Sequence, residues 1–286
     1  MFFLKCRKFI LSFFLINFIL FLTGCNCGFL HPKGFIAEEQ KFLIIIAFIT
    51  MLFIIVPVFF MTFLFFIKYR ESNLNVHYRP NWSHSSVIEL LIWGFPVIII
   101  VFLSILSWKS THDLDPRKHI VSDFSPIKIN VISLDWKWLF IYPNEKIATI
   151  NELVFPMNTP IIFELTSNSV MNSFFIPALG SQIYTMAGMH TTLNLIANKF
   201  GIYKGISANY SGKGFSNMKF KTVVTPDISS FKRWINKVQC SKNYLNSMLR
   251  FKEIAIPNEN SIIQYYSNVK KDLFNIVIRN NKNIHK

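Results

Sequence analysis

Two long uncharged stretches constrain this chain more than any other feature of its sequence. Residues 42–67 and 90–108 contain no charged side chain, and they are about 26 and about 19 residues long. Helices of this length can cross a hydrocarbon layer about 30 Å thick, and runs so free of charge are rare inside soluble cores. We therefore expect two transmembrane helices, over 42–67 and 89–109, joined by a loop over 68–88.

A third apolar stretch, residues 9–22, follows a basic cluster that contains Lys5, Arg7 and Lys8. A basic start followed by about 14 apolar residues is typical of a secretory signal peptide and is short for a membrane span. The stretch ends in Leu22-Thr23-Gly24-Cys25, which resembles the lipobox of bacterial lipoproteins. The resemblance implies that residues 1–24 are removed and that Cys25 carries a lipid such as palmitate. The alternative is an uncleaved anchor helix followed by a chance cysteine.

These features predict a topology in the bacterial inner membrane. A lipid on Cys25 would hold residues 25–41 on the outer face, so that the first helix runs inward, loop 68–88 is cytoplasmic, and residues from 110 onward lie in the periplasm. Lysine and arginine flank both sides of the membrane, so the positive-inside rule does not decide the orientation. The orientation rests on the signal peptide and the lipobox.

Composition excludes some classes of protein. Hydrophobic side chains make up 51% of the chain and charged ones 16%, which argues against a cytosolic enzyme and a disordered chain. The net charge of +15 could indicate a nucleic-acid partner, but the basic residues are scattered, and we expect none. Cys27 and Cys240 are the cysteines left after Cys6 and Cys25, and we expect no disulfide between them.

The expected periplasmic part, 110–226, shows the pattern of a β-sandwich. Apolar and polar residues alternate over 127–131, 161–165 and 218–222, which is typical of half-buried strands, and turn-forming residues separate these runs. After Pro226 the apolar period becomes helical, with Asp227 in the position of an N-cap. We expect residues 227–286 to form a C-terminal helical tail.

Three segments of this part resemble subunit II of the haem–copper terminal oxidases. They are Asp135-Trp136-Lys137-Trp138, 170–177 and 205–218, and Pro80-Asn81-Trp82-Ser83-His84 before the second helix adds a fourth. The similarity covers nearly the whole mature chain and is strongest to the bo-type ubiquinol oxidases. The fold that it implies is a membrane hairpin of two helices, a cupredoxin-like β-sandwich and a C-terminal helical extension.

In the copper-bearing relatives, 170–177 and 205–218 supply a dinuclear copper centre held by two cysteines, two histidines, a methionine and a glutamate carbonyl. The resemblance places those ligands here at Asn172, Ser207, Asn209, Ser211, Phe215 and Met218, of which Met218 alone keeps its type. Copper that cycles between two oxidation states needs soft thiolate and imidazole donors. We therefore expect no metal, no cofactor and no catalytic residue in this chain, and we expect its polar loop residues to satisfy one another.

The resemblance also implies a function. Without that copper, the complex would oxidise ubiquinol rather than cytochrome c, with quinol, haem and the remaining copper bound by subunit I. This chain would be a structural and assembly subunit of a proton-pumping oxidase in the aerobic respiratory chain, beside subunits I, III and IV and membrane lipid. We expect Trp136 and Trp138 to pack against subunit I.

Glu89 is a candidate for a role in proton uptake. In the resembling family, an acid on this helix stands at the mouth of a proton channel into subunit I. A carboxylate in the first turn of a helix also stabilises the helix dipole, which is an alternative reason for its presence. Two further functions stay open: an electron-transfer copper protein, and a free-standing lipoprotein whose sandwich binds a periplasmic ligand.

Overall fold

The computed structural model describes residues 30–73, 81–120, 122 and 124–284. The described chain forms two compact units, one within Gln40–Asp115 and the other made of the residues up to Glu39 together with those from Pro116 onward. The predicted signal peptide and Cys25 lie outside the described residues.

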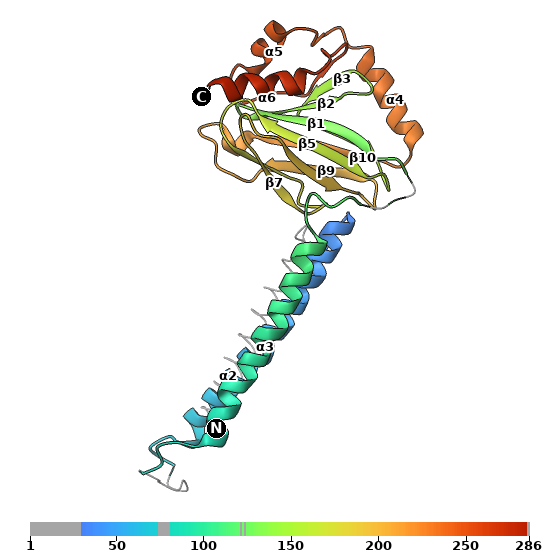
Figure 1. The fold of residues 1–286 in the computed structure, drawn as a ribbon. Helices are drawn as coiled ribbons and strands as arrows, with labels where there is room; N and C mark the ends of the chain where they lie inside the picture. Colours follow the sequence, from blue (N-terminus) through green and yellow to red (C-terminus); the bar gives the residue numbers. More distant parts are fainter. Residues whose placement is uncertain (1–29, 74–80, 121, 123, 285–286) are drawn as a thin grey trace, which may run out of the picture. The chain divides into compact units, whose positions relative to one another are not determined.

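The first unit consists mainly of two apolar helices, α2 (Phe35–Lys68), whose residues up to Glu39 belong to the other unit, and α3 (Ser86–Asp113) (Figure 1). Both are long and apolar enough to cross a membrane, and 0% and 6% of the residues in the apolar 18-residue windows of α2 and α3 are buried. A helix that is apolar on all sides and unburied in water needs lipid or another protein around it. The helices reach beyond 42–67 and 89–109 because they continue through polar residues at their ends, such as Lys41 in α2 and His112 in α3.

Eleven strands among the described residues of the second unit form two sheets (Figure 1). The first sheet has the order β11-β3-β2-β1-β5-β8, and the second has the order β4-β10-β9-β6-β7. The pairs β1–β5 and β4–β10 are parallel, and the other pairs are antiparallel. The bounds are β1 (Ile127–Leu134), β2 (Lys137–Tyr142), β3 (Ile147–Ile150), β4 (Glu152–Pro156), β5 (Ile161–Ser167), β6 (Asn172–Phe175), β7 (Gln182–Thr185), β8 (Thr191–Leu195), β9 (Gly201–Ser207), β10 (Lys219–Thr225) and β11 (Gln264–Tyr266).

Aromatic side chains fill the space between the two sheets. Trp138 packs edge-on against Phe174 with ring centroids 5.3 Å apart, and Phe174 stacks on Phe220 at 5.1 Å. All three are at most 3% exposed. Edge-to-face and offset-stacked contacts of this kind add to the free energy gained by burying the rings. The expected strands at 127–131, 161–165 and 218–222 correspond to β1, β5 and β10, whose inward residues belong to this core.

The C-terminal residues build a second hydrophobic core on the outer face of the first sheet. They contain α4 (Ile228–Gln239), α5 (Met248–Ala255) and α6 (Leu273–Ile284) (Figure 1). They also contain β11, which extends the sheet beside β3. Phe251 and Leu273 pack there with Leu139 and Ile141 of β2. With both faces covered, every residue of β2 is buried, so this strand lacks the alternation that marks a half-exposed one. The segment predicted as a helical tail is therefore an integral part of the domain that also contributes a strand.

The start of this C-terminal segment agrees with its prediction. Asp227 is the N-cap of α4, where its carboxylate accepts a hydrogen bond of 3.0 Å from the backbone N–H of Ser230. Phe231 and Val238 form the buried stripe of the helix. An aspartate cap satisfies one of the free N–H groups at the helix start and also favours the helix dipole.

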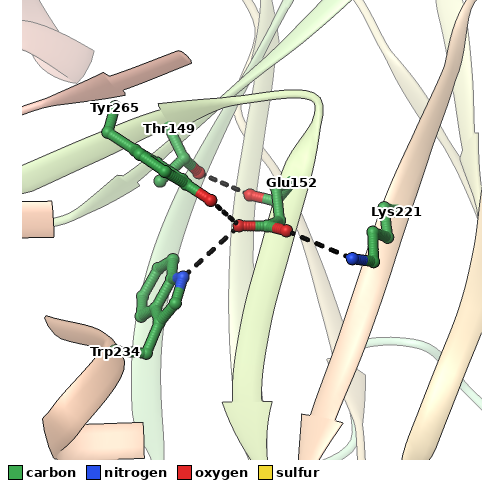
Figure 2. Close-up of polar contacts among 5 residues, drawn as sticks. All are labelled: Thr149, Glu152, Lys221, Trp234 and Tyr265. Carbon is green, nitrogen blue, oxygen red and sulfur yellow. Dashed lines mark hydrogen bonds and ion pairs between the residues drawn. The ribbon is translucent and has the colours of Figure 1, made fainter. Parts of the chain in front are cut away.

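A buried carboxylate links the C-terminal segment to the second sheet (Figure 2). Glu152 of β4 is 6% exposed, and its Oε2 accepts hydrogen bonds from the Tyr265 hydroxyl at 2.6 Å and the Trp234 indole N–H at 3.3 Å. Its Oε1 lies 3.7 Å from the Lys221 ammonium. Tyr265 belongs to β11 and Trp234 to α4, so one carboxylate joins three elements that are distant in the sequence.

Candidate functional site

The expected copper-ligand positions lie where β6, β9 and the loop before β10 meet. Strands β6 and β9 are neighbours, with Phe174 opposite Ser207, and the Ala208 N–H donates to the Ser173 carbonyl at 3.0 Å. The loop returns so that the Ser207 N–H donates to the Met218 carbonyl at 3.1 Å. The structure therefore brings Asn172, Ser207 and Met218 together, and each is at most 5% exposed.

Hydrogen bonds connect the polar residues at these positions to one another and to the backbone. The Ser207 hydroxyl has two acceptors within reach, Oδ1 of Asn172 at 3.2 Å and the carbonyl of Asn209 at 3.3 Å. The Asn209 amide donates to backbone carbonyls, including that of Met171 at 3.3 Å, and the Ser211 hydroxyl lies 3.9 Å from the Met218 sulfur. The loop residues thus satisfy one another only in part, because most of their partners are backbone carbonyls.

Trp136 contacts the loop before β10 through its indole ring. Its indole N–H donates to the Ser211 carbonyl at 3.1 Å, and its φ of 64° places it in the left-handed region, within the two-residue turn between β1 and β2. The loop passes close over the ring, since a Cβ added to Gly214 would lie 2.4 Å from a ring carbon. A side chain at Gly214 would therefore push the loop away from the indole.

The prediction for the two tryptophans is wrong for Trp138. That side chain is 0% exposed inside the sandwich, against Phe174 and Phe220, so it has no surface left for another subunit. The motif pairs two tryptophans two residues apart, but Trp136 sits in the turn and supports the loop while Trp138 belongs to the core.

Apolar side chains are exposed around the same loop. Val170 and Met171 before β6 are 48% and 38% exposed, and Tyr210 in the loop is 75% exposed. The Tyr210 ring packs edge-on against Phe215, with centroids 5.7 Å apart. We call these four residues the loop patch. The patch lies beside Asn209, whose amide donates to the Met171 carbonyl.

Glu89 and Cys240 belong to other elements. Glu89 is in the first turn of α3, and its side chain is exposed. Within the residues that the structure describes, there is no group of three or more His, Cys, Asp or Glu side chains that could hold a metal ion. Cys240, at the end of α4, is exposed and unpaired by a disulfide.

Sequence reasoning missed the role of the aromatic residues near the C-terminus and a buried lysine in β2. Phe251, Tyr266 and Phe274 belong to the core that covers the first sheet, and the density of aromatic residues over 244–274 was the signal for it. Lys137, at the start of the apolar strand β2, is only 6% exposed although its side chain carries an ammonium group. Its neighbours come from residues more than 100 positions away, which no local pattern reveals.

Comparisons with known proteins define the class first. Residues 120–225 match the family described as cytochrome c oxidase subunit II, periplasmic domain, and residues 239–282 match the COX aromatic-rich motif. The sandwich and the C-terminal segment therefore place the chain in the class of oxidase subunits II. The periplasmic domain of subunit II of cytochrome oxidase from Bradyrhizobium japonicum has 23% identity and a TM-score of 0.39, covering 42% of this chain and 96% of that one.

Curated relatives narrow the class. Cytochrome bo(3) ubiquinol oxidase subunit 2 of Buchnera aphidicola subsp. Baizongia pistaciae is 63% identical over 97% of this chain and 97% of its own length. The protein of the same name from Pseudomonas putida is 49% identical over 91% of this chain and 82% of its own. The chain belongs to the subunit II family of the bo-type ubiquinol oxidases.

Proposed function

We propose that this chain is the non-catalytic subunit II of a proton-pumping ubiquinol oxidase, and that its sandwich keeps the shape of a copper domain without binding copper. In this proposal, haem, copper and the quinol are bound by subunit I. The chain's own task is structural: it assembles with subunits I, III and IV and covers the periplasmic side of the complex.

The donor set at the six positions is the observation that carries this proposal. The side chains there are two amides, two hydroxyls, one phenyl ring and one thioether, of Asn172, Asn209, Ser207, Ser211, Phe215 and Met218, so the thiolate and imidazole ligands of the relatives are missing. A serine hydroxyl stays protonated near neutral pH and does not bridge two copper ions as a thiolate does, and a phenyl ring has no lone pair. The Ser207 hydroxyl, moreover, already has two acceptors within the loop.

The loop patch supports a role in assembly. Val170, Met171 and Tyr210 present apolar surface around a loop that Trp136 contacts, and the half-buried Phe215 packs against Tyr210. Clustered exposed apolar side chains on a rigid support are typical of protein–protein interfaces. In this proposal the patch packs on subunit I, where the copper-bearing relatives would pass electrons.

Oxygen consumption by the membrane assembly purified through this chain tests the proposal. We expect the preparation to contain haem and to oxidise ubiquinol but not reduced cytochrome c. When subunit I is separated from this chain, we expect all of the copper to stay with subunit I. Oxidation of cytochrome c, or copper that stays with this chain, would contradict the loss of the copper site. A preparation without haem and without either activity would instead favour the free-standing lipoprotein.

We also propose how the chain is processed and which side of the membrane its domain occupies, on the basis of the sequence. Cys25 is lipidated after removal of residues 1–24, and residues from 110 onward lie in the periplasm. The intact mass of the chain in the same preparation checks this, because a mature chain starting at Cys25 with added acyl groups has a mass that an uncleaved chain cannot have.

Glu89 is proposed as an entry point for protons. The substitution Glu89→Gln keeps the shape of the side chain and removes its charge, so we expect a several-fold slower oxygen consumption with ubiquinol in a fully assembled complex. Glu38, an acid in the first turn of α2, provides the matched control Glu38→Gln. If both variants are equally slow or equally unaffected, the role of Glu89 is limited to its helix end.

A further inference from the structure

A cavity of about 940 Å³ lies between the first sheet and the C-terminal segment. Lys137 of β2, Ile150 of β3 and Gln264 of β11 line it on the sheet side, and α5 with the residues that follow it lines the other side. The C-terminal segment therefore does not only cover the sheet. Beside α5 it leaves a space of the size that proteins use for small molecules.

A buried ammonium group lines this cavity. Lys137 is 6% exposed, and its Nζ donates a hydrogen bond of 2.8 Å to the Ile256 carbonyl. An ammonium has three donors, and among the described residues no carboxylate lies within 4 Å of this one. Burial lowers the pKa of Lys137, and the Asp135 carboxylate offsets part of that effect from a longer distance. A buried charge without an ionic partner is costly, so a fold that keeps one beside a cavity gains from an anion there.

The mouth of the cavity adds positive charge. Lys242 and Arg250 line it, and both side chains are exposed. Glu253 is the one acidic residue of the lining, and its carboxylate is paired with Arg250 at 2.9 Å. The electrostatic balance of the cavity is therefore positive, with its most buried cation at the base and two more at the entrance.

Apolar side chains form much of the remaining wall. Ile150 of β3, Ile254 of α5 and Ile262 before β11 line the same space. Apolar walls with a few charged groups are the usual composition of a site for a molecule that has a charged head and an apolar body.

We propose that this cavity binds an amphipathic anion, whose carboxylate or phosphate head pairs with Lys137, Lys242 and Arg250 while its short apolar body lies against the isoleucines. The head completes the hydrogen bonds of the Lys137 ammonium. The site is formed only when the C-terminal segment is folded on the sheet, so a bound ligand stabilises that segment.

Calorimetric titration of the assembled complex, kept in a neutral maltoside detergent, tests the proposal. Octanoate and octyl phosphate are the probes, and octanol is the neutral control of equal chain length. We expect one saturable site for at least one of the anions and none for octanol. The anion that binds more tightly identifies the head group. A saturable site for octanol of equal affinity, or no site for either anion, would overturn the proposal.

Variants at the mouth separate binding from folding. The double substitution Lys242→Gln and Arg250→Gln changes two exposed side chains, and we expect it to weaken anion binding at least tenfold. Lys232→Gln with Lys252→Gln is the matched control, because it removes the same charge from exposed positions that do not line the cavity. Equal affinities in the two double variants would overturn the proposed pairing of the anion with Lys242 and Arg250. Lys137→Met is expected to abolish binding, with circular dichroism to verify its fold.

Discussion

At the scale of single residues, Glu152 connects the C-terminal segment most directly to the rest of the domain. Its carboxylate is buried and receives two hydrogen bonds from side chains that belong to that segment, Tyr265 and Trp234. Hydrogen bonds to an ionised acceptor are about twice as strong as those between neutral groups. Burial, and then the bond to Glu152, raise the pKa of Tyr265 to about 12.

The substitution Tyr265→Phe should therefore destabilise the domain by about 1–2 kcal/mol, since it removes a charge-assisted hydrogen bond at a half-buried position. The raised pKa means that the folded state keeps the hydroxyl proton when the unfolded chain loses it. The contribution is thus fully present below about pH 10 and is lost as the pH rises through about 12. Denaturant unfolding of the parent and of the Tyr265→Phe variant, at pH 8 and above pH 11, measures this difference in the free energy of unfolding.

The control for this prediction is Tyr184→Phe, which alters an exposed tyrosine. We expect a change within about 0.5 kcal/mol for it. A Tyr265→Phe variant as stable as the Tyr184→Phe variant at pH 8 would show that the carboxylate does not hold β11 and α4 in place.

At the scale of elements, the C-terminal segment determines the character of the first sheet. It places α5 and α6 on the outer face of the sheet and β11 at its edge. The outer face of strands such as β2 is therefore buried by protein instead of facing solvent. Its residues pack with β2 through side chains such as Phe251 and Leu273. The segment should therefore unfold as a unit and expose the apolar face of β2 when its packing is weakened.

Phe251→Ala tests that dependence. Phe251 is 2% exposed, so its truncation is expected to cost about 3–5 kcal/mol and to open the segment. We expect limited proteolysis to cut within 241–263 much faster than in the parent, while the sandwich stays resistant. Leu249→Ala on the same helix, where the side chain is 74% exposed, should leave the cleavage rate nearly unchanged. Equal rates for the two variants would contradict a cooperative segment.

At the scale of the whole molecule, the chain combines two units that need different surroundings. The apolar side chains of α2 and α3 are exposed on all sides, whereas the sandwich has buried cores and a mixed surface. Water cannot satisfy the first unit, and a hydrocarbon layer cannot satisfy the second. Assembly of the oxidase should therefore depend on the apolar character of α3 near its middle.

Ile100→Lys is the corresponding prediction. Ile100 is 61% exposed and central in α3, and a lysine there costs about 2.5–3.5 kcal/mol on insertion scales. We expect much less chain in the membrane fraction and less haem recovered with it. Thr111→Lys, near the end of the same helix, should insert normally because its ammonium reaches the interface. Equal recovery of both variants would mean that α3 does not lie in a hydrocarbon layer.

Local patterns in the sequence were enough to predict the two apolar helices, the strands β1, β5 and β10, the cap Asp227 and the likeness to oxidase subunit II. Each of these depends on residues close together in the chain: a charge-free run, an alternation of two, a capping residue, or a short motif. The positions Asn172 and Ser207 were also predicted as neighbours, although only through the resemblance. Their hydrogen bond then follows from the pairing of β6 with β9.

Tertiary structure alone decided the rest. The buried strand β2 does not alternate between apolar and polar residues, so the sequence does not indicate that a second layer covers it. The position of Trp138 in a motif likewise does not indicate that its side chain belongs to the core. The carboxylate of Glu152 meets Tyr265, and the ammonium of Lys137 meets the carbonyl of Ile256, across more than 100 residues. Such contacts arise from the packing of one segment on another, and the free energy that selects them comes from burial over the whole domain rather than from any local preference.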